Sequence, residues 1–592
     1  MRGGGYQGAS VIRRGWNLGF ATVGATAALA LGAAPAHGQQ QPVPQGALPT
    51  QDQITPPTPE PADTPRARVD SRGALEAAPC PFDDSPLRLN LTQVRFARPD
   101  GSALQPEIAA ALAGIELPTG DQPVRVVCDV RDAANAALRR GGWIASVQVP
   151  PQEIAGGELR LNVVTARIVE TRVRGDAGPY EELLRRRIAE LEGLDPLNER
   201  TAERLLLLAG DVPGLDVALT LRPAGTGQGD VVGELTISYR RFQVLGNVQN
   251  YNSRLLGRET AYVRAEYFGL TGLGDITYVG GSTTADFEEQ RIVQVGHIMN
   301  VGASGATVGG RFSYAWSRPD LGPLDFRTDT LIAGFDVTAP ITRSLNRNAL
   351  AAFGFDYVDQ KTDIGAGGTL LPLTADKLRI LYGRLSGDIR RVRGDGGVAH
   401  QLAMSLEVRK GLDVFDASEP GFSGGRLQSR IDGEAEAVVV RATASGLLGL
   451  GKYFALAGEA IGQYASDPLL NYEEFAAGNL TIGRGYDPGS NSGDRAAAFR
   501  AELQANVPLL PANVQLFGFY DHVHLDNLDV GSIERNRTLR SYGGGVRVAL
   551  PGSALLEVAY AHPRDRALRI DDEPPPDRLL VSLSFRFRDR AR

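Results

Sequence analysis

Hydrophobic and polar residues alternate with a period of two through most of the chain after about Arg241. Within His400–Arg409, polar residues take one face, and the other face carries Leu402, Met404, Leu406 and Val408. Residues Arg430–Ala437 and Leu579–Phe587 alternate in the same way. Such alternation is typical of β-strands that bury one face. The C-terminal part of the chain is therefore predicted to consist of short strands between Gly- and Asp-rich turns.

The polar faces of these strands carry charges of both signs, such as Glu407 and Arg409. A soluble sandwich also alternates, but apolar residues outside and charged residues inside are typical of a membrane barrel. Counting the segments gives about sixteen strands, an even number that returns both ends to one side. We therefore predict an all-β transmembrane barrel of about sixteen antiparallel strands over residues 240–592.

A strand–helix–helix–strand–strand unit occurs twice before this region, in residues 79–165 and 166–239. The two copies are about 75 residues apart, and an internal repeat outweighs any single motif. The first copy is expected to have strands and helices at Leu89–Phe96, Pro106–Ala113, Asp129–Arg140, Ile144–Val149 and Glu158–Val164. The second is expected to have them at Arg167–Arg174, Tyr180–Leu191, Asn198–Ala209, Val217–Leu221 and Val232–Tyr239. The N-terminal half is thus predicted to hold two small α+β domains.

The N-terminus has the pattern of an export signal. Two arginines precede an apolar run of small residues from Trp16 to Ala34, with small-residue cleavage positions after it. Residues 1–38 are therefore interpreted as a signal peptide, in preference to a membrane anchor. Residues 39–78 are interpreted as a Pro- and Gln-rich linker, mobile or extended over most of its length, with a possible short helix at Arg66–Ala78.

The composition fits this reading. The chain of 592 residues has 62 basic and 69 acidic residues, a mildly acidic balance that argues against nucleic-acid binding. Its 71 glycines and only 3 methionines fit strands and turns better than helices. After the N-terminus no run of 18 apolar residues occurs, which excludes helical membrane spans from the expected architecture.

Cys80 and Cys128 are the only cysteines. In an exported protein two lone thiols are expected to form a disulfide, which here closes a loop of about 48 residues. A metal site needs more ligands, and no histidine lies near either cysteine in the sequence. The alternative is a pair of buried free thiols.

No catalytic constellation is present in the sequence. Among six histidines only His522 and His524 are close together, and the strand period places Asp521 on the opposite face. These residues therefore do not predict a metal site. There is no Gly-x-Ser-x-Gly elbow and no phosphate-binding loop. We expect no enzyme activity, no metal and no cofactor.

The turn Gly483-Arg484-Gly485-Tyr486 is the candidate functional motif. An arginine between two glycines is a charged tip on a backbone that turns sharply, and it needs an anionic partner. The turn falls between the strands expected at Tyr453–Gln463 and Ala497–Val507, the eleventh and twelfth. It therefore lies in the sixth loop of the outer end, residues 465–495. An ordinary glycine-rich surface turn is the alternative.

Three stretches resemble a known family. Gly142–Ile154, with its Pro151-Gln152 turn, and the following Gly157-Glu158-Leu159 resemble a POTRA domain. Asp211–Gly214 resembles the turn after the second helix of the next POTRA domain. Phe475–Tyr486 resembles the inserted loop of two-partner secretion translocators of the TpsB type, the haemolysin secretion/activation proteins ShlB, FhaC and HecB. These belong to the POTRA-barrel superfamily of the outer membrane.

The resemblance implies a role for the arginine. In that family the loop folds back into the barrel lumen, and its arginine pairs with a carboxylate on the wall. Phe519-Tyr520-Asp521 resembles the wall motif, so Asp521 is the first candidate partner and Glu502 the second. Asp521 capping a strand near an outer loop is the alternative. Gly483 stands where the family usually has valine or leucine, which implies a looser tip.

The resemblance also implies a function. It predicts an outer-membrane translocator whose periplasmic POTRA domains capture an unfolded, β-helix-prone exoprotein and pass it through the barrel without nucleotide hydrolysis. The second domain would present the client groove, although Leu205–Leu208 on its helix are mostly core. The other expected partners are membrane lipid and the barrel-assembly machinery, which reads a final strand such as the one ending at Phe587. The alternatives are a barrel-assembly or autotransporter-assembly factor, and a passive porin or adhesive surface barrel.

Overall fold

The computed structural model describes residues 46–55, 68–70, 74–75, 79–83, 85–366, 368–394, 396–423, 425–509, 512–551 and 553–589. The expected signal peptide, residues 1–38, lies outside the described residues. The chain forms two compact units. One is essentially Pro65–Arg240, and the other combines the described residues 46–55 with nearly all of Arg241–Asp589. No helix in the described part of the chain is long and apolar enough to cross a membrane.

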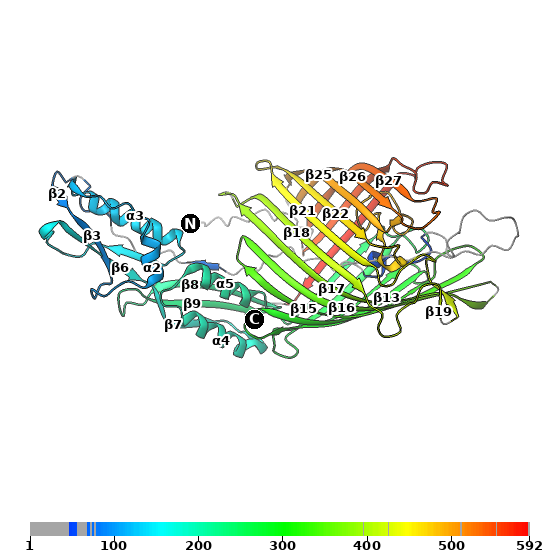
Figure 1. Cartoon of the computed structure of the whole chain (residues 1–592), viewed down its shortest axis with the longest axis horizontal. Helices are drawn as coiled ribbons and strands as arrows, with labels where there is room; N and C mark the ends of the chain where they lie inside the picture. Colours follow the sequence, from blue (N-terminus) through cyan, green and yellow to red (C-terminus); the bar gives the residue numbers. More distant parts are fainter. Residues whose placement is uncertain are drawn as a thin grey trace. The chain divides into compact units, whose positions relative to one another are not determined.

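Sixteen strands form a closed antiparallel barrel, in which each strand pairs with its neighbours around the ring (Figure 1). The strands are β10 (Phe242–Gln249), β11 (Thr260–Phe268), β12 (Ile276–Thr284), β13 (Gln290–Val301), β14 (Ala306–Ser317), β15 (Asp325–Arg343), β16 (Arg347–Ala366), β17 (Thr369–Val392), β18 (Val398–Gly411), β21 (Val438–Gly449), β22 (Phe454–Ala465), β25 (Arg495–Leu509), β26 (Ala512–Asp526), β27 (Asn536–Leu550), β28 (Ala554–Pro563) and β29 (Arg578–Arg588). The barrel closes where β10 pairs with β29, with Val244 opposite Phe587. The predicted barrel of sixteen strands is confirmed.

The alternating polar and apolar residues of each strand face the lumen and the outer surface of the barrel, respectively. On β18, Leu402, Met404, Leu406 and Val408 are exposed on the outer surface, whereas Ser405, Glu407 and Arg409 are buried toward the lumen. A barrel leaves no unpaired sheet edge, so every strand can place its apolar side chains against lipid. The small hairpin of β19 (Phe422–Ser423) and β20 (Arg426–Leu427) lies in the loop between β18 and β21.

Residues 412–437 between β18 and β21 correct one expectation. The alternating run Arg430–Ala437 is predicted to be a strand, but in the structure it forms turns, and β21 begins only at Val438. The turns bring the Arg430 side chain to a buried group of carboxylates, which an extended strand at this place would not do.

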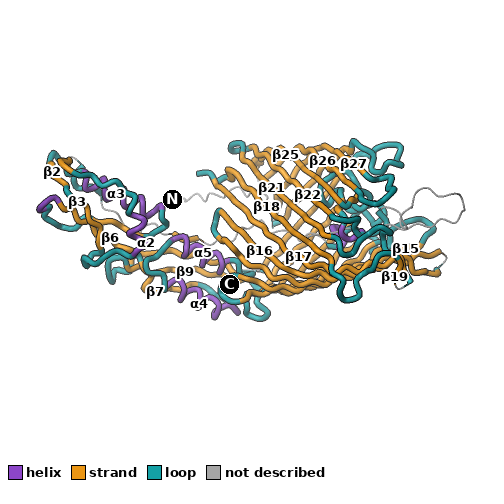
Figure 2. Tube along the Cα trace, in the orientation of Figure 1, coloured by secondary structure: helices purple, strands orange, loops and turns teal. Residues whose placement is uncertain are grey.

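The other compact unit begins with a three-stranded sheet of β3 (Gln93–Ala97), β6 (Glu158–Thr165) and β5 (Ala145–Gln148), in that order. The helices α2 (Pro106–Leu112) and α3 (Val126–Arg140) lie beside this sheet (Figure 2). Its apolar side packs against them, with Ile108, Val130, Leu138 and Leu161 in the core. A two-stranded sheet of β2 (Arg88–Leu91) and β4 (Gly120–Pro123) lies in the same part of the chain. The two helices and the last two strands follow in the predicted order, but the strand predicted at Leu89–Phe96 is divided into β2 and β3, and β4 between the helices was not predicted.

Pro151 and Gln152, the turn motif of this part, connect β5 to β6. The Gln152 Nε2 donates to the Arg160 carbonyl at 2.7 Å, and the Arg160 N–H donates to the Gln152 Oε1 at 2.8 Å. The side chain therefore fastens the turn to β6 as a backbone strand would. The 3-10 turn η1 (Ala155–Gly157) completes the connection.

The second sheet has the order β1-β8-β9-β7, with β1 (Arg68–Asp70), β8 (Leu215–Pro223), β9 (Asp230–Tyr239) and β7 (Arg167–Arg174). The 3-10 turn η2 (Gly178–Tyr180) and the helices α4 (Glu181–Glu192) and α5 (Glu199–Gly210) complete this half. Leu206, Leu207 and Leu208 on α5 are buried in the core. The two small α/β halves match the predicted fold class of POTRA-like units before a barrel.

Strand β1 was not expected. The possible helix at Arg66–Ala78 is not what the structure has there, since Arg68–Asp70 are extended and pair in parallel with Ala218–Thr220 of β8. Without β1, the edge of β8 would have unpaired backbone groups, which an extended segment can pair with. A short helix in water is only marginally stable, so pairing with β8 is the more favourable state of this segment. The chain thus adds a strand of its own to this edge.

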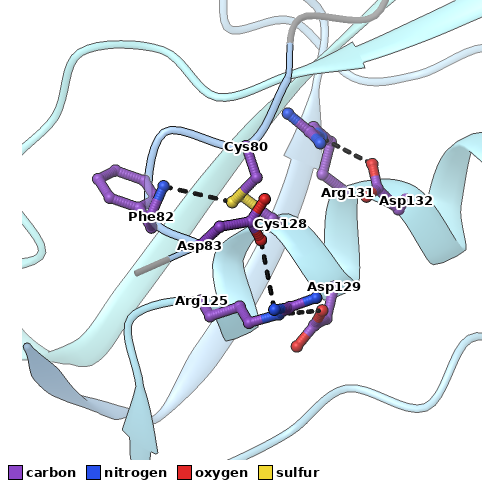
Figure 3. Close-up of a disulfide and its surroundings, with 8 residues drawn as sticks. All are labelled: Cys80, Phe82, Asp83, Arg125, Cys128, Asp129, Arg131 and Asp132. Carbon is purple, nitrogen blue, oxygen red and sulfur yellow. Dashed lines mark hydrogen bonds and ion pairs between the residues drawn. A yellow bond between two sulfur atoms is a disulfide. The ribbon is translucent and has the colours of Figure 1, made fainter. Parts of the chain in front are cut away.

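The two cysteines are joined in the structure by a disulfide, Cys80–Cys128 (Figure 3). Their Cα atoms are 5.8 Å apart, within the usual range for a disulfide. Cys128 lies in the first turn of α3, where Arg125 makes ion pairs with Asp83 at 3.4 Å and with Asp129 at 3.6 Å. The bond therefore ties the segment before β2 to the helix of the first sheet.

Replacing both Cys80 and Cys128 by serine is expected to lower the free energy of unfolding of this half by about 2–4 kcal/mol, because the unfolded chain regains the entropy of a long loop. Urea titration with pulse proteolysis of the full chain in detergent measures the change. Arg88→Ala, which removes an exposed pair with Asp121, is the control and should change stability little. Equal unfolding midpoints for the parent and the serine variant under oxidising conditions would contradict the prediction.

Candidate functional site

The candidate site is built from the loop between β22 and β25, residues 466–494, called L6 below. β22 and β25 are the eleventh and twelfth strands of the barrel, as predicted. L6 contains the 3-10 turn η3 (Asn471–Glu473) and a two-stranded hairpin of β23 (Phe475–Ala476) and β24 (Ser492–Gly493). Nearly all its side chains are buried, and they contact the inward faces of β25 to β27. The loop therefore lies inside the barrel.

The tip of L6 is a tight turn held by its own backbone. The Gly478 N–H donates to the Ile482 carbonyl, and the Asn479 N–H donates to the Tyr486 carbonyl, each at 3.1 Å. Gly483 and Gly485 have φ angles of +119° and +97°, which L-residues with a side chain rarely adopt. A side chain at residue 485 would also lie only 2.7 Å from the ring of Pro563. Glycine at both positions allows the tight turn that places Arg484 against the barrel wall.

The side chain of Arg484 is buried against the wall. Its Nη1 and Nη2 both donate to Oε2 of Glu502 on β25, each at 3.1 Å. The guanidinium carbon lies 4.4 Å from the ring centre of Phe519 and 5.3 Å from that of Phe517, both on β26. A cation over an aromatic face is attracted to it, more so where water is excluded. Arg547 on β27 also pairs with Glu502, with Nη1–Oε1 at 2.5 Å.

Asp521 binds the backbone of the tip. Its Oδ2 accepts the N–H groups of Gly483 at 3.0 Å and Arg484 at 2.9 Å. Its remaining charge is met by Arg500 of the neighbouring strand, with Nε–Oδ1 at 2.9 Å and Nη2–Oδ2 at 2.8 Å. Both candidate carboxylates therefore contact the tip. Glu502 accepts hydrogen bonds from the Arg484 guanidinium, and Asp521 accepts them from the backbone N–H groups of Gly483 and Arg484.

Tyr486 anchors the other side of the tip. Its hydroxyl lies 2.9 Å from the Arg540 carbonyl and 3.0 Å from the Asp565 carbonyl, and it accepts the Asp565 N–H at 3.0 Å. Its ring packs among Phe475, Ile482, Ala498, Val523 and Leu525. All four residues of the predicted motif therefore take part in seating the loop.

The part of L6 before the tip, called its first stem, and the part after the tip, called its second stem, are both largely buried. The first stem is held by a second ionic contact that the sequence did not predict. Glu473 in η3 accepts Nε and Nη2 of Arg409 at 3.1 and 3.0 Å, and Nη2 of Arg441 at 3.1 Å. Arg409 also donates to Glu407 Oε1 on its own strand at 3.0 Å. Arg409 and Arg441 both lie on the inward face of their strands. The alternation of polar and apolar residues predicts that such a residue faces the lumen, but it does not predict its partner.

The described N-terminal segment, residues 46–55, also lies in the barrel (dark blue in Figure 1). It contains the short helix α1 (Gln51–Ile54), which begins with a capping box. The Gln53 N–H donates to the Thr50 hydroxyl at 3.2 Å, and the Thr50 N–H donates to the Gln53 Oε1 at 2.8 Å. The Gln53 Nε2 donates at 2.5 Å to the Oδ1 of Asn252, which lies in the loop between β10 and β11.

Apolar contacts hold this segment in place. Leu48 packs with Phe326 and Ile364, and Ile54 packs among lumen residues of the wall and of L6, namely Ile292, Ile332, Val358, Leu470 and Tyr472. Part of the arm interpreted as a mobile linker is therefore a plug in the lumen. We call residues 46–55 the plug segment.

His522 and His524 contact the two strands that neighbour β26, namely β25 and β27. His522 stacks on Phe499 with ring centres 5.3 Å apart, and His524 contacts the Thr538 hydroxyl at 3.2 Å. Within the residues that the structure describes, no group of three or more His, Cys, Asp or Glu side chains is arranged to hold a metal ion.

A closed barrel with apolar residues outside, ion pairs inside and a loop folded back into its lumen defines an outer-membrane β-barrel with an inserted loop. Residues 394–548, about a quarter of the chain, match the family model described as haemolysin secretion/activation protein ShlB/FhaC/HecB. This range contains L6, Glu502, Asp521 and Arg547. The match confirms the resemblance to two-partner secretion translocators.

Solved structures with the same fold include CdiB from Escherichia coli, at 16% sequence identity and a TM-score of 0.67. That match covers 87% of this chain and 94% of the other. CdiB from Acinetobacter baumannii has 17% identity and a TM-score of 0.61, over 91% of this chain and 95% of the other. No curated protein matches the sequence. At such identities the likeness shows the fold of the matched part and nothing beyond the fold.

Proposed function

We propose that this chain secretes an unfolded partner exoprotein through its barrel, without nucleotide hydrolysis. The observation that carries the proposal is the tip of L6 seated on Glu502 and Asp521 inside a sixteen-stranded barrel. A passive porin has no need of two α/β domains before the barrel, nor of an ion-paired loop that fills its lumen. The proposal assigns no catalytic residue and no cofactor.

In this proposal the two α/β halves, residues 79–165 and 166–239, are periplasmic POTRA domains that receive the client. The edge of β8 beside α5 is suited to this because it accepts an added strand: Arg68–Asp70 of β1 occupy it in parallel. Strand addition uses backbone hydrogen bonds and makes little demand on sequence, which suits a β-prone client. A client strand at this edge would replace β1.

Transport then requires the lumen to clear, because both the plug segment and L6 occupy it. The charged pairs that hold L6 are reversible contacts, and their carboxylates and guanidiniums regain water when the loop moves. The client is drawn outward as it folds on the far side. Residues 1–38 would direct the chain to export, and the final strand would be read by the barrel-assembly machinery.

Deleting Leu89–Tyr239 tests the function. With Cys80→Ser added, because Cys128 is lost, the barrel is expected to assemble and conduct ions but to export none of its client. The assay co-expresses the variant with an epitope-tagged exported protein chosen from the adjacent genes and measures that protein in the medium. The full chain at equal abundance is the control.

Two outcomes would oppose the proposal. Undiminished export by the deleted chain would show that the α/β halves do not capture the client. A general loss of other outer-membrane barrels in a strain lacking the chain would favour the assembly-factor alternative instead.

A further inference from the structure

A buried arginine outside the tip joins three loops at the outer end of the barrel. Arg430 lies in L5, the loop of residues 412–437 between β18 and β21, and is 1% exposed. Its Nη1 donates to the Leu469 carbonyl at 2.8 Å, to Glu474 Oε1 at 2.9 Å and to Asp494 Oδ1 at 2.5 Å. Its Nη2 donates to Asp494 Oδ2 at 3.0 Å and also to Asp529.

These partners belong to different segments. Leu469 and Glu474 are in the first stem of L6, and Asp494 is the last residue of its second stem. Asp529 is in L7, the loop of residues 527–535 between β26 and β27. We call Arg430, Glu474, Asp494 and Asp529 the stem node. One guanidinium therefore connects both stems of L6 to both neighbouring loops.

Asp494 reinforces the node through its backbone partners. Its Oδ1 also accepts the Leu469 N–H at 2.8 Å, and its Oδ2 accepts the Leu528 N–H at 2.7 Å. A further contact joins L5 directly to L7, since the Val530 N–H donates to Asp432 Oδ2 at 3.2 Å. The outer ends of L5, L6 and L7 are thus fastened at one place.

The charge of the node makes it suited to opening. It holds three carboxylates and one arginine, and all four side chains are buried. Carboxylates kept this close and dry are stable only while the arginine stays between them. Once it leaves, they repel one another and are better placed in water. Such an arrangement favours either the closed loops or their full separation over a partly opened node.

We propose that the stem node is a latch that keeps the outer end of the barrel closed, and that Arg430 is its positioning residue. The proposal rests on the proposed function, because an outer end needs a latch only if a chain must leave through it. It is separate from the tip contact, since the stem node shares no residue with Arg484, Glu502 and Asp521. Release of the tip alone would leave the stems of L6 in place.

The test is the channel record of the purified full chain in planar lipid bilayers, which needs no client. Arg430→Met is expected to raise the open probability at least about tenfold, because removing one partner of a buried ionic group is strongly destabilising. Arg426→Met is the matched control: Arg426 lies on the same loop, but its Nη1 donates to the Thr362 carbonyl at 2.8 Å and its Nη2 pairs with Asp363 at 2.7 Å, both on β16. Its record should match the parent.

One conservative variant separates a latch from a merely structural residue. Asp494→Asn is nearly isosteric and removes the charge that meets Arg430, so it should open the channel and serves if Arg430→Met does not fold. Folding is checked by heat-modifiable migration in electrophoresis.

Folded Arg430→Met or Asp494→Asn barrels with the parent's open probability would overturn the latch. So would an equally open Arg426→Met barrel. Failure of the parent to secrete its client would instead count against the proposed function, so the two failures are distinguishable.

Discussion

Arg484→Ala is expected to reduce export of the client at least about tenfold while the barrel reaches the outer membrane in normal amount. The change removes a guanidinium whose two nitrogens both bind Glu502 and which lies over the ring of Phe519. Breaking a buried pair by removing one partner costs about 3–5 kcal/mol. Glu502 keeps Arg547 as a partner, so the loss falls on the seating of L6 and not on the wall.

Export is measured as tagged client in the medium, normalised to the amount of heat-modifiable barrel. Arg484→Lys keeps the charge but loses the two-nitrogen contact, and it should fall between the alanine variant and the parent. Arg566→Ala is the matched control, because the Arg566 guanidinium bonds only an exposed carbonyl, that of Asp571, among its described contacts. Full export by Arg484→Ala at normal abundance would remove the tip from the mechanism.

The sequence was most informative where a local pattern and the fold depend on the same periodicity. Alternation on strands such as β18 predicted which side chains face lipid, and it placed the arginine turn between the eleventh and twelfth strands. The position of the turn between two predicted strands was as useful for identifying the loop as its residue sequence. Inward polar positions could be identified in this way because a strand offers only two faces.

The partner of the arginine could not be settled by the same means. Glu502 and Asp521 both point into the lumen, from adjacent strands on which Arg500 is directly opposite Asp521. That register gives Asp521 a cation of its own, and its Oδ2 accepts the backbone N–H groups of the tip as well as Nη2 of Arg500. The pairing of strands across a sheet is a long-range property, and a motif on one strand does not contain it.

Arg430 shows a different limit. Its run of alternating charged and small residues predicts a strand, because the period of two is the only signal that the stretch carries. Its partners Asp494 and Asp529 are 64 and 99 residues further along the chain. Only the closed barrel brings the three loops together, so neither the turn nor the node could be read from the sequence around Arg430.

The plug segment was hidden by its composition. A Gln- and Pro-rich arm has too few apolar residues to form a core, and only Leu48 and Ile54 are large and apolar in residues 46–55. Thr50 and Gln53 do carry the spacing of a capping box, which marks the start of a helix. The lumen supplies the apolar partners that the arm lacks.

Replacing residues 46–55 by a Gly/Ser segment of equal length is expected to open the barrel and raise its mean conductance several-fold in planar bilayers. Burying Leu48 and Ile54 contributes roughly 1.5–3 kcal/mol each, which holds the plug yet leaves it releasable. The replacement removes both side chains and the Gln53–Asn252 contact at 2.5 Å, but it keeps the length of the arm. The L6 contacts at Glu502 are untouched, so the barrel should remain folded.

Ile54→Asp makes the same test with one residue, because it places a charge among Ile332, Val358 and Leu470 in the lumen, where an unpaired carboxylate is costly. Ile54→Val removes a single methylene and is the matched control, expected to behave as the parent. Conductance that stays at the parent's level in both the Gly/Ser and the aspartate variant would mean that the plug segment does not block the path. Higher conductance with unchanged export would mean that the plug segment blocks only the passage of ions. L6 would then be the remaining barrier to the client.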